Sequence, residues 1–103
     1  GYLGYIASKG AVTTMTKSLA VTYGREGIRV NSIHPGFIDT PMLREELAGL
    51  PEGSAEAILQ TIPLGRFATA DEISGAVAFL ASDDASYISG AELLIDGAHL
   101  AGR

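Results

Sequence analysis

The stretch Ile28-Arg29-Val30-Asn31-Ser32-Ile33-His34-Pro35-Gly36 decides the fold class of this 103-residue chain. It is short and rich in β-branched residues, and Pro35-Gly36 ends it, which predicts a strand over residues 28–34. A second apolar run, Glu92-Leu93-Leu94-Ile95, lies between Ser89-Gly90 and Asp96-Gly97 and predicts a mostly buried strand. The other expected elements lie before the first of these strands and between the two.

A helix is expected between the two strands. Thr69 and Glu72 have the spacing of a capping box, and Ile73, Val77 and Leu80 follow on one face, which predicts a helix over about residues 70–82. A strand, a crossover helix and a second strand imply parallel pairing, with helices on the faces of the sheet. The fold class is therefore α/β. Two strands alone are marginal in water, so the pattern calls for further strands beside them.

The residues before the first strand predict a helix over about residues 5–23. Val12, Met15 and Leu19 recur at three- and four-residue steps, and Gly24 is expected to end the helix in the left-handed conformation. Near its start, Tyr5 and Lys9 lie four residues apart. Their Cβ atoms would be roughly 5–6 Å apart on one face, so the ammonium can favour the ionised phenol. The alternative is an ordinary exposed pair in a first helical turn.

Composition excludes several classes of protein. The chain has 12 acidic and 7 basic residues, a net charge of -5 and no Lys/Arg cluster, which argues against nucleic acid and anionic membranes as partners. It has no cysteine, and its two histidines, His34 and His99, are far apart in sequence, so no metal site is predicted. No apolar run is long enough to span a membrane and no signal peptide is recognisable, so the expected location is cytoplasmic.

Five motifs in order carry a resemblance to a known family. The chain resembles the C-terminal portion of a short-chain dehydrogenase/reductase, and within that family it is similar to hydroxysteroid dehydrogenases and 3-oxoacyl reductases. The resemblance implies that residues 1–103 are the C-terminal part of one doubly wound, Rossmann-type domain with a parallel sheet. Two positions depart mildly from the family, Ser89 in place of a common threonine and Ala98 in place of a common glycine. The motifs are Tyr5-Ile6-Ala7-Ser8-Lys9, Ile28 to Gly36, Thr40-Pro41-Met42, Leu64-Gly65-Arg66-Phe67 and Ile88 to Gly97.

By this resemblance Tyr5 is the catalytic acid/base, and Lys9 both tunes it and binds the nicotinamide ribose of NAD or NADP. A free tyrosine has a pKa of about 10, so work near neutrality needs a shift of roughly three units. The reaction implied is hydride transfer between the nicotinamide and a carbonyl or secondary alcohol. Tyr5 and Lys9 then serve both the cofactor and the reacting oxygen.

The other implied cofactor-binding residues are Pro35, Gly36, Ile38 and Thr40, directly after the first strand, where an open α/β sheet binds its ligands. Gly36 would let the backbone approach the nicotinamide, Ile38 would bond the carboxamide, and the Thr40 hydroxyl would bond the cofactor. The structural alternatives are a plain turn at Pro35-Gly36 and a helix cap at Thr40, with Pro41 in the first helical position.

Residues 41–66, here called the lid segment, carry apolar side chains among charges, interrupted by Pro51, Gly53 and Pro63. In the family this region covers the substrate, which would be a small hydrophobic carbonyl or alcohol. Two short amphipathic helices packing on the sheet are an equal alternative. Asn31, Arg66 and His34 are interpreted as structural residues.

The family's glycine-rich cofactor turn and the Asn and Ser of its catalytic group would precede Tyr5, and none occurs in these 103 residues. We therefore expect the chain alone to be inactive. The choice between NAD and NADP depends on the same absent region. The first helix and residues 91–96 are expected to join subunits of a homo-oligomer, a dimer or tetramer. The alternative function is a truncated, non-catalytic remnant that acts as an oligomerisation module.

Overall fold

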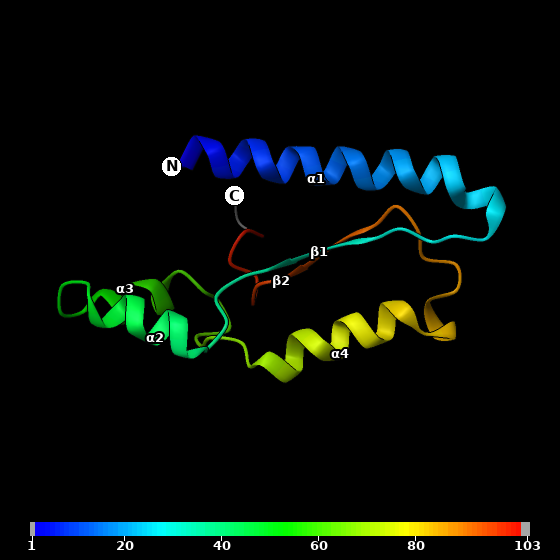
Figure 1. The fold of residues 1–103 in the computed structure, drawn as a ribbon. Helices are drawn as coiled ribbons and strands as arrows, with labels where there is room; N and C mark the ends of the chain where they lie inside the picture. The colour runs from blue at the N-terminus through cyan, green and yellow to red at the C-terminus, as the bar shows by residue number, and fades with distance from the viewer. Residues whose placement is uncertain (1, 102–103) are drawn as a thin grey trace. The chain divides into compact units, whose positions relative to one another are not determined.

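A computed structural model describes residues 2–101, with side chains from residue 7 onward (Figure 1). Within them the fold is mixed α/β with a two-stranded parallel sheet, as predicted. The chain divides into two compact units, Gly1–Ile33 with Ala78–Leu93 and His34–Val77 with Leu94–Arg103. The elements in order are α1 (Tyr2–Tyr23), the 3-10 helix η1 (Gly24–Glu26), β1 (Ser32–Pro35), α2 (Pro41–Ala48), α3 (Ser54–Gln60), α4 (Ala70–Ala81), the 3-10 helix η2 (Asp83–Ala85) and β2 (Glu92–Ile95).

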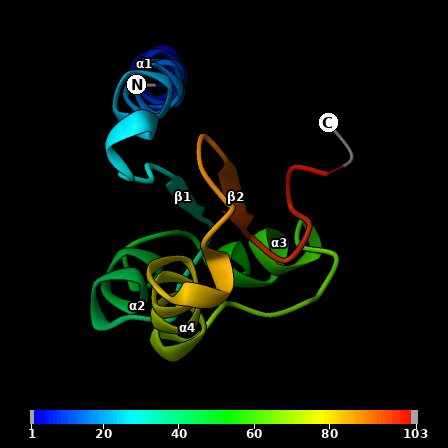
Figure 2. The same cartoon turned by 90° about the vertical axis from the view of Figure 1, so that its right-hand side faces the viewer.

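The predicted first helix is confirmed as α1, which is a single straight helix when seen end-on in Figure 2. The prediction that Gly24 ends it in the left-handed conformation is wrong. Gly24 instead begins η1, and the left-handed residue is Gly27, with a φ of 77°. The Gly27 N–H donates to the Gly24 carbonyl at 3.0 Å, so the last turn tightens before the chain reverses.

The first strand is shorter than predicted, because residues 28–31 are held mainly by side chains. The Val30 N–H donates to the Ser89 hydroxyl at 3.2 Å instead of to a backbone carbonyl. The Asn31 amide donates to the Ile88 carbonyl and accepts from the Ala91 N–H, both at 3.0 Å. The strand ladder then begins at Ser32, so β1 covers Ser32–Pro35 in place of residues 28–34.

The second unit contains the lid segment, which folds as two short helices, α2 and α3, as one of the two expectations has it; the packing of these helices on the sheet stays a prediction. Thr40 caps α2: its hydroxyl oxygen accepts from the Leu43 N–H at 3.1 Å, and Pro41 fills the first helical position. Gly53, with a φ of 87°, precedes α3. The lid segment therefore starts at a fixed point immediately after the loop that follows β1.

Few apolar side chains are buried in the described part of the chain. Ile62 in the second unit is 4% exposed and Ala85 in the first unit is fully buried, whereas Met15 on α1 is 59% exposed. Thr16 is also buried, and its hydroxyl donates to the Val12 carbonyl of α1 at 2.8 Å. Among the described residues no helix is both long enough and apolar enough to cross a membrane.

Candidate active site

Tyr5 and Lys9 both lie in α1, in the first unit, one helical turn apart. The Lys9 side chain is half-buried. The Tyr5 side chain lies outside the described side chains, so the pairing of its phenol with the Lys9 ammonium stays a prediction. The helix gives the backbone spacing that the pairing requires.

The predicted cofactor-binding residues all belong to the second unit: Pro35 ends β1, and Gly36, Ile38 and Thr40 lie in the loop that follows it. The Gly36 N–H donates to the Ile95 carbonyl at 2.9 Å, which continues the pairing of β1 with β2. A Cβ on Gly36 would lie 2.8 Å from the Asp96 Cβ and 3.0 Å from its Cα. The absence of a side chain at position 36 is therefore what allows the loop and the end of β2 to approach so closely.

Ile38 forms a parallel bridge with Ala68 in which its own backbone groups are not used. The Ala68 N–H donates to the Phe37 carbonyl at 2.9 Å, and the Asp39 N–H donates to the Ala68 carbonyl at 2.8 Å. Among the described residues, no hydrogen bond engages the Ile38 N–H or carbonyl. A donor and an acceptor thus remain side by side on one residue of an otherwise fixed loop.

The remaining polar groups of this loop are ordered by α2. The Arg44 guanidinium contacts the Asp39 carboxylate at 2.7 and 3.0 Å, and its hydrogen bonds lower the pKa of that carboxyl below its usual value. The Thr40 hydroxyl oxygen accepts from Leu43, which leaves its hydrogen available for a further acceptor. The structure therefore confirms the capping role of Thr40 and is compatible with a cofactor contact.

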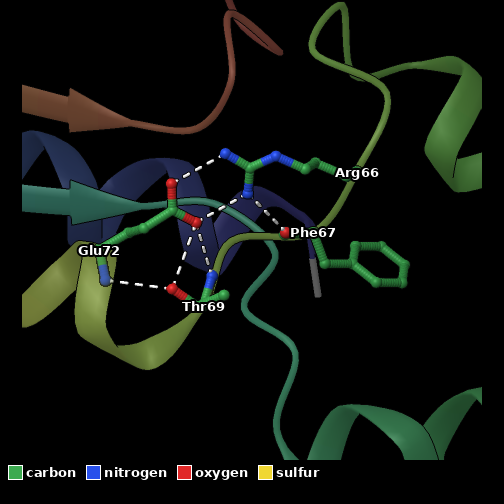
Figure 3. Close-up of polar contacts among 4 residues, drawn as sticks. All are labelled: Arg66, Phe67, Thr69 and Glu72. Carbon is green, nitrogen blue, oxygen red and sulfur yellow. Dashed lines mark hydrogen bonds and ion pairs between the residues drawn. The ribbon is translucent and has the colours of Figure 1, made fainter.

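Arg66, at the outgoing end of the lid segment, is bound to the start of α4 (Figure 3). Its two terminal nitrogens donate to the two Glu72 oxygens at 2.7 and 2.9 Å, and one of them also reaches the Phe67 carbonyl at 3.3 Å. Glu72 in turn accepts from the Thr69 N–H at 2.9 Å, and its own N–H donates to the Thr69 hydroxyl, which confirms the predicted capping box. The Arg66 and then the Thr69 hydrogen bonds lower the pKa of Glu72 to about 2.

A hollow of about 340 Å³ lies within the second unit, beside this ion pair. Its walls are mostly apolar, and Arg66, Glu72 and Asp96 supply the charges on them. Its lining residues are Phe37, Ile62, Leu64, Arg66, Ala68, Glu72, Leu94, Ile95, Asp96, Gly97 and Ala98.

Sequence reasoning missed two contacts of this unit. The sequence interpretation of Arg66 as a structural residue names no partner for it, although its separation of six residues from the capping Glu72 could have indicated the ion pair. His99 bonds to Thr61 across 38 residues, and no local sequence pattern signals a contact at that distance.

Comparison with known proteins places this arrangement in a family. A family model described as enoyl-(acyl carrier protein) reductase matches residues 1–98. A short-chain dehydrogenase of Neurospora crassa is 44% identical over 97 residues, covering 94% of this chain and 35% of the relative. The chain belongs to the short-chain dehydrogenase/reductase family. Another short-chain dehydrogenase/reductase, the cyclopentanol dehydrogenase of Comamonas, is 48% identical over 101 residues, which are 98% of this chain and 40% of that protein.

Solved structures of the short-chain dehydrogenase/reductase family have the same fold. A protein from Agrobacterium tumefaciens with bound NADP matches with a TM-score of 0.85 and 41% identity, over 94% of this chain and 39% of that one. A 4-hydroxyisoleucine dehydrogenase complexed with NADH matches with a TM-score of 0.86 and 34% identity, over 96% and 40% of the two chains. Residues 1–103 thus span about two fifths of the length of these short-chain dehydrogenases/reductases and have a Rossmann-type fold, as predicted.

Proposed function

We propose that this chain supplies the tyrosine and lysine part of the active site of an NAD(P)-dependent oxidoreductase, which interconverts a secondary alcohol and a carbonyl. The observation that carries the proposal is the loop after β1, in which the Ile38 N–H and carbonyl have no partner among the described residues. A carboxamide needs one acceptor and one donor, and Ile38 offers both from a backbone fixed by Ala68.

The residues present fit the nicotinamide end of NAD or NADP. Ile38 would hold the carboxamide, the backbone of Pro35 and Gly36 would lie against the ring, and Thr40 would donate its hydroxyl hydrogen. Thr40 also stands at the N-terminus of α2, whose free N–H groups favour negative charge. When bound, the nicotinamide supplies or accepts the hydride. Family relatives solved with NADP and with NADH support either nucleotide.

Tyr5 and Lys9 would handle the proton. In the reducing direction the Tyr5 hydroxyl donates its proton to the carbonyl oxygen, and in the oxidising direction the phenolate removes the proton of the alcohol. The half-buried Lys9 ammonium favours the phenolate by its charge and would also bond the nicotinamide ribose. The lid segment, with Met42 on α2 70% exposed and Leu50 between α2 and α3 50% exposed, would cover the substrate.

We infer a small, apolar alcohol or carbonyl as the substrate class. The Comamonas relative is a cyclopentanol dehydrogenase, and a second relative from Acinetobacter is a cyclohexanol dehydrogenase. A homo-oligomer also belongs to this proposal, because α1, the helix that the family resemblance expects to join subunits, leaves Val12 and Met15 exposed. The cytoplasm, where NAD and NADP are available, is the compartment that we propose for this function.

The test is a chimera in which residues 1–101 replace the matched segment of the Comamonas cyclopentanol dehydrogenase, which then supplies the rest of the domain. We expect the chimera to form reduced nucleotide from cyclopentanol and NAD or NADP. The absorbance of the reduced nucleotide measures the rate. Tyr5→Phe should lower kcat by roughly 100-fold or more, since positioned acid/base groups contribute on that scale, while nucleotide still binds. Tyr23→Phe, at the far end of α1, is the matched control and should leave kcat unchanged.

Two outcomes would contradict the proposal. Full activity of the Tyr5→Phe chimera would remove the acid/base assignment. A folded, inactive chimera beside an active parent enzyme would favour the non-catalytic oligomerisation module. Residues 1–103 alone should form no reduced nucleotide under the same conditions, and turnover by the isolated chain would show that it needs no further segment.

A further inference from the structure

His99 lies in the tail that follows β2, residues 96–101, and contacts the outgoing end of the lid segment. Its Nδ1 is 3.0 Å from the Thr61 carbonyl oxygen and 3.1 Å from the Thr61 hydroxyl oxygen. Thr61 is the residue that ends α3. In Figure 2 the tail, drawn in red, passes beside the green segment that carries α3 before it rises to the C-terminus, in agreement with these contacts. All of these residues belong to the second unit.

The two contacts determine which ring nitrogen of His99 carries the hydrogen. A carbonyl oxygen only accepts, so a hydrogen bond to it requires a hydrogen on Nδ1. The single hydroxyl hydrogen of Thr61 is already donated to the Ile58 carbonyl at 2.6 Å, so the hydroxyl oxygen too can only accept from His99. Nδ1–H therefore donates to both Thr61 oxygens, and one donor holds the end of α3.

The same tail is fastened to the lid segment at two further points. The Leu64 N–H donates to the Gly97 carbonyl at 3.2 Å, and the buried Ile62 packs so closely on Gly97 that a Cβ there would lie 2.9 Å from the Ile62 methyl group. The tail itself is ordered by Asp96, whose carboxylate accepts from the N–H groups of Ala98 and Leu100 at 3.0 and 3.3 Å.

Phe37 connects the tail and the outgoing end of the lid segment to the loop after β1. Its ring meets the His99 ring edge-on with centroids 5.8 Å apart, and it contacts the Phe67 ring at 6.2 Å. Phe37 stands between Gly36 and Ile38, the residues proposed to hold the nicotinamide. The His99 ring is therefore in contact with both the lid segment and the cofactor loop.

We propose that His99 is a positioning residue for the substrate: its Nδ1–H holds the outgoing end of the lid segment at a fixed distance from the cofactor loop. This inference rests on the proposed function, because it assumes that residues 41–66 cover the substrate. Loss of the donor should weaken substrate binding without removing any group that touches the reacting atoms.

The test uses the chimera with the Comamonas enzyme throughout, and its structural part needs no substrate. Nitrogen NMR of the wild type should show hydrogen on His99 Nδ1. In amide exchange, His99→Ala should accelerate the Leu64 amide by about tenfold, which is the scale of one hydrogen bond. His99→Asn is the matched variant, because the Asn side-chain nitrogen takes the position of Nδ1, and it should restore exchange to within about twofold.

The kinetic part uses cyclopentanol as the probe. His99→Ala should raise KM about fivefold with kcat within about twofold, and His99→Asn should return KM toward the wild-type value. If amide exchange responds as expected and KM does not, His99 does hold the end of the lid segment, but the lid segment does not position the substrate. The proposal is then wrong. If the protein does not oxidise the alcohol at all, the proposed function has failed, and the exchange and nitrogen data still decide whether His99 holds Thr61.

Three further results would overturn the inference. A wild-type spectrum without hydrogen on Nδ1 would exclude the donor geometry. Unchanged exchange of the Leu64 amide in His99→Ala would show that the other contacts suffice. Equal losses in His99→Ala and His99→Asn would assign the effect to ring packing on Phe37 instead of to the hydrogen bond.

Discussion

Gly36 is the residue on which the path of the loop after β1 depends. Any side chain at this position would meet the backbone of Asp96, because a Cβ would lie 3.0 Å from the Asp96 Cα. The Pro35-Gly36 pair could be found in the sequence as the end of a strand. Its partner Asp96 could not, because 60 residues separate them and only the pairing of β1 with β2 brings them together.

We predict that Gly36→Ala destabilises the protein by about 1–3 kcal/mol, the usual cost of inserting atoms into a filled space. The measurement is urea unfolding monitored by circular dichroism. Gly75→Ala is the matched control, since no atom lies within 4 Å of its Cβ position and Gly75 is inside α4. That change should stabilise by roughly 0.5–1 kcal/mol. Equal stability of Gly36→Ala and wild type would mean that the loop can shift without cost.

Ala98, which replaces a glycine common in the family, adopts a backbone conformation that is unfavourable for alanine. The sequence indicated only that alanine replaces a common glycine. In the structure Ala98 has a φ of 72°, in the left-handed region that favours glycine. The tail that carries His99 is therefore held in place despite an unfavourable backbone conformation.

Ala98→Gly should stabilise the protein by about 0.5–1 kcal/mol, the relief of the left-handed strain less the entropy that glycine gains in the unfolded chain. Ala76→Gly, in the middle of α4, is the opposite control and should cost about 1 kcal/mol. Thermal melts of the three proteins give the comparison. A loss of stability in Ala98→Gly would contradict the assignment of strain at this residue.

At the scale of elements, local signals were sufficient for the helices and insufficient for one strand. The Thr69 and Glu72 capping box, the Thr40-Pro41 start and the apolar run over 92–95 are each confirmed within a residue or two. The 28–34 strand was predicted too early, because Asn31 and Ser89 bond the backbone there by their side chains. Such side-chain contacts compete with the ladder and depend on residues almost 60 positions away.

The start of α4 should respond to acid through Glu72. Its pKa is lowered to about 2 in the folded protein from an ordinary value near 4.5, because Arg66 and Thr69 bond the ionised form. A lowered folded pKa stabilises the protein fully above the unfolded pKa, and the contribution is lost as pH falls from about 4.5 through about 2. Both side chains are about half exposed, so water screens the pair and reduces its contribution.

Glu72→Gln should therefore lower Tm at pH 7, and the difference from wild type should shrink steadily between pH 5 and pH 2.5. Scanning calorimetry across that range gives the curve. Glu45→Gln in α2 is the control for the removal of a charge, because the Glu45 carboxylate has no hydrogen bond or ion pair among the described residues. A Glu72→Gln difference that does not change with pH would show that the ion pair adds nothing beyond the cap.

At the scale of the whole chain, the low burial of apolar side chains is the feature with the largest thermodynamic consequence. Of the described hydrophobic side chains, Ile62 and Ala85 are the buried ones, and a two-stranded sheet is marginal in water. Residues 1–103 alone should thus unfold with a heat-capacity increment clearly below the roughly 12–15 cal/mol/K per residue of globular domains, because that increment follows the apolar surface exposed. In the chimera with the Comamonas enzyme, strands of the relative would flank the sheet, and the increment per residue should reach that range. Calorimetry of both proteins decides the point, and a full-sized, cooperative transition of the isolated chain would show that these residues bury their own core without further partners.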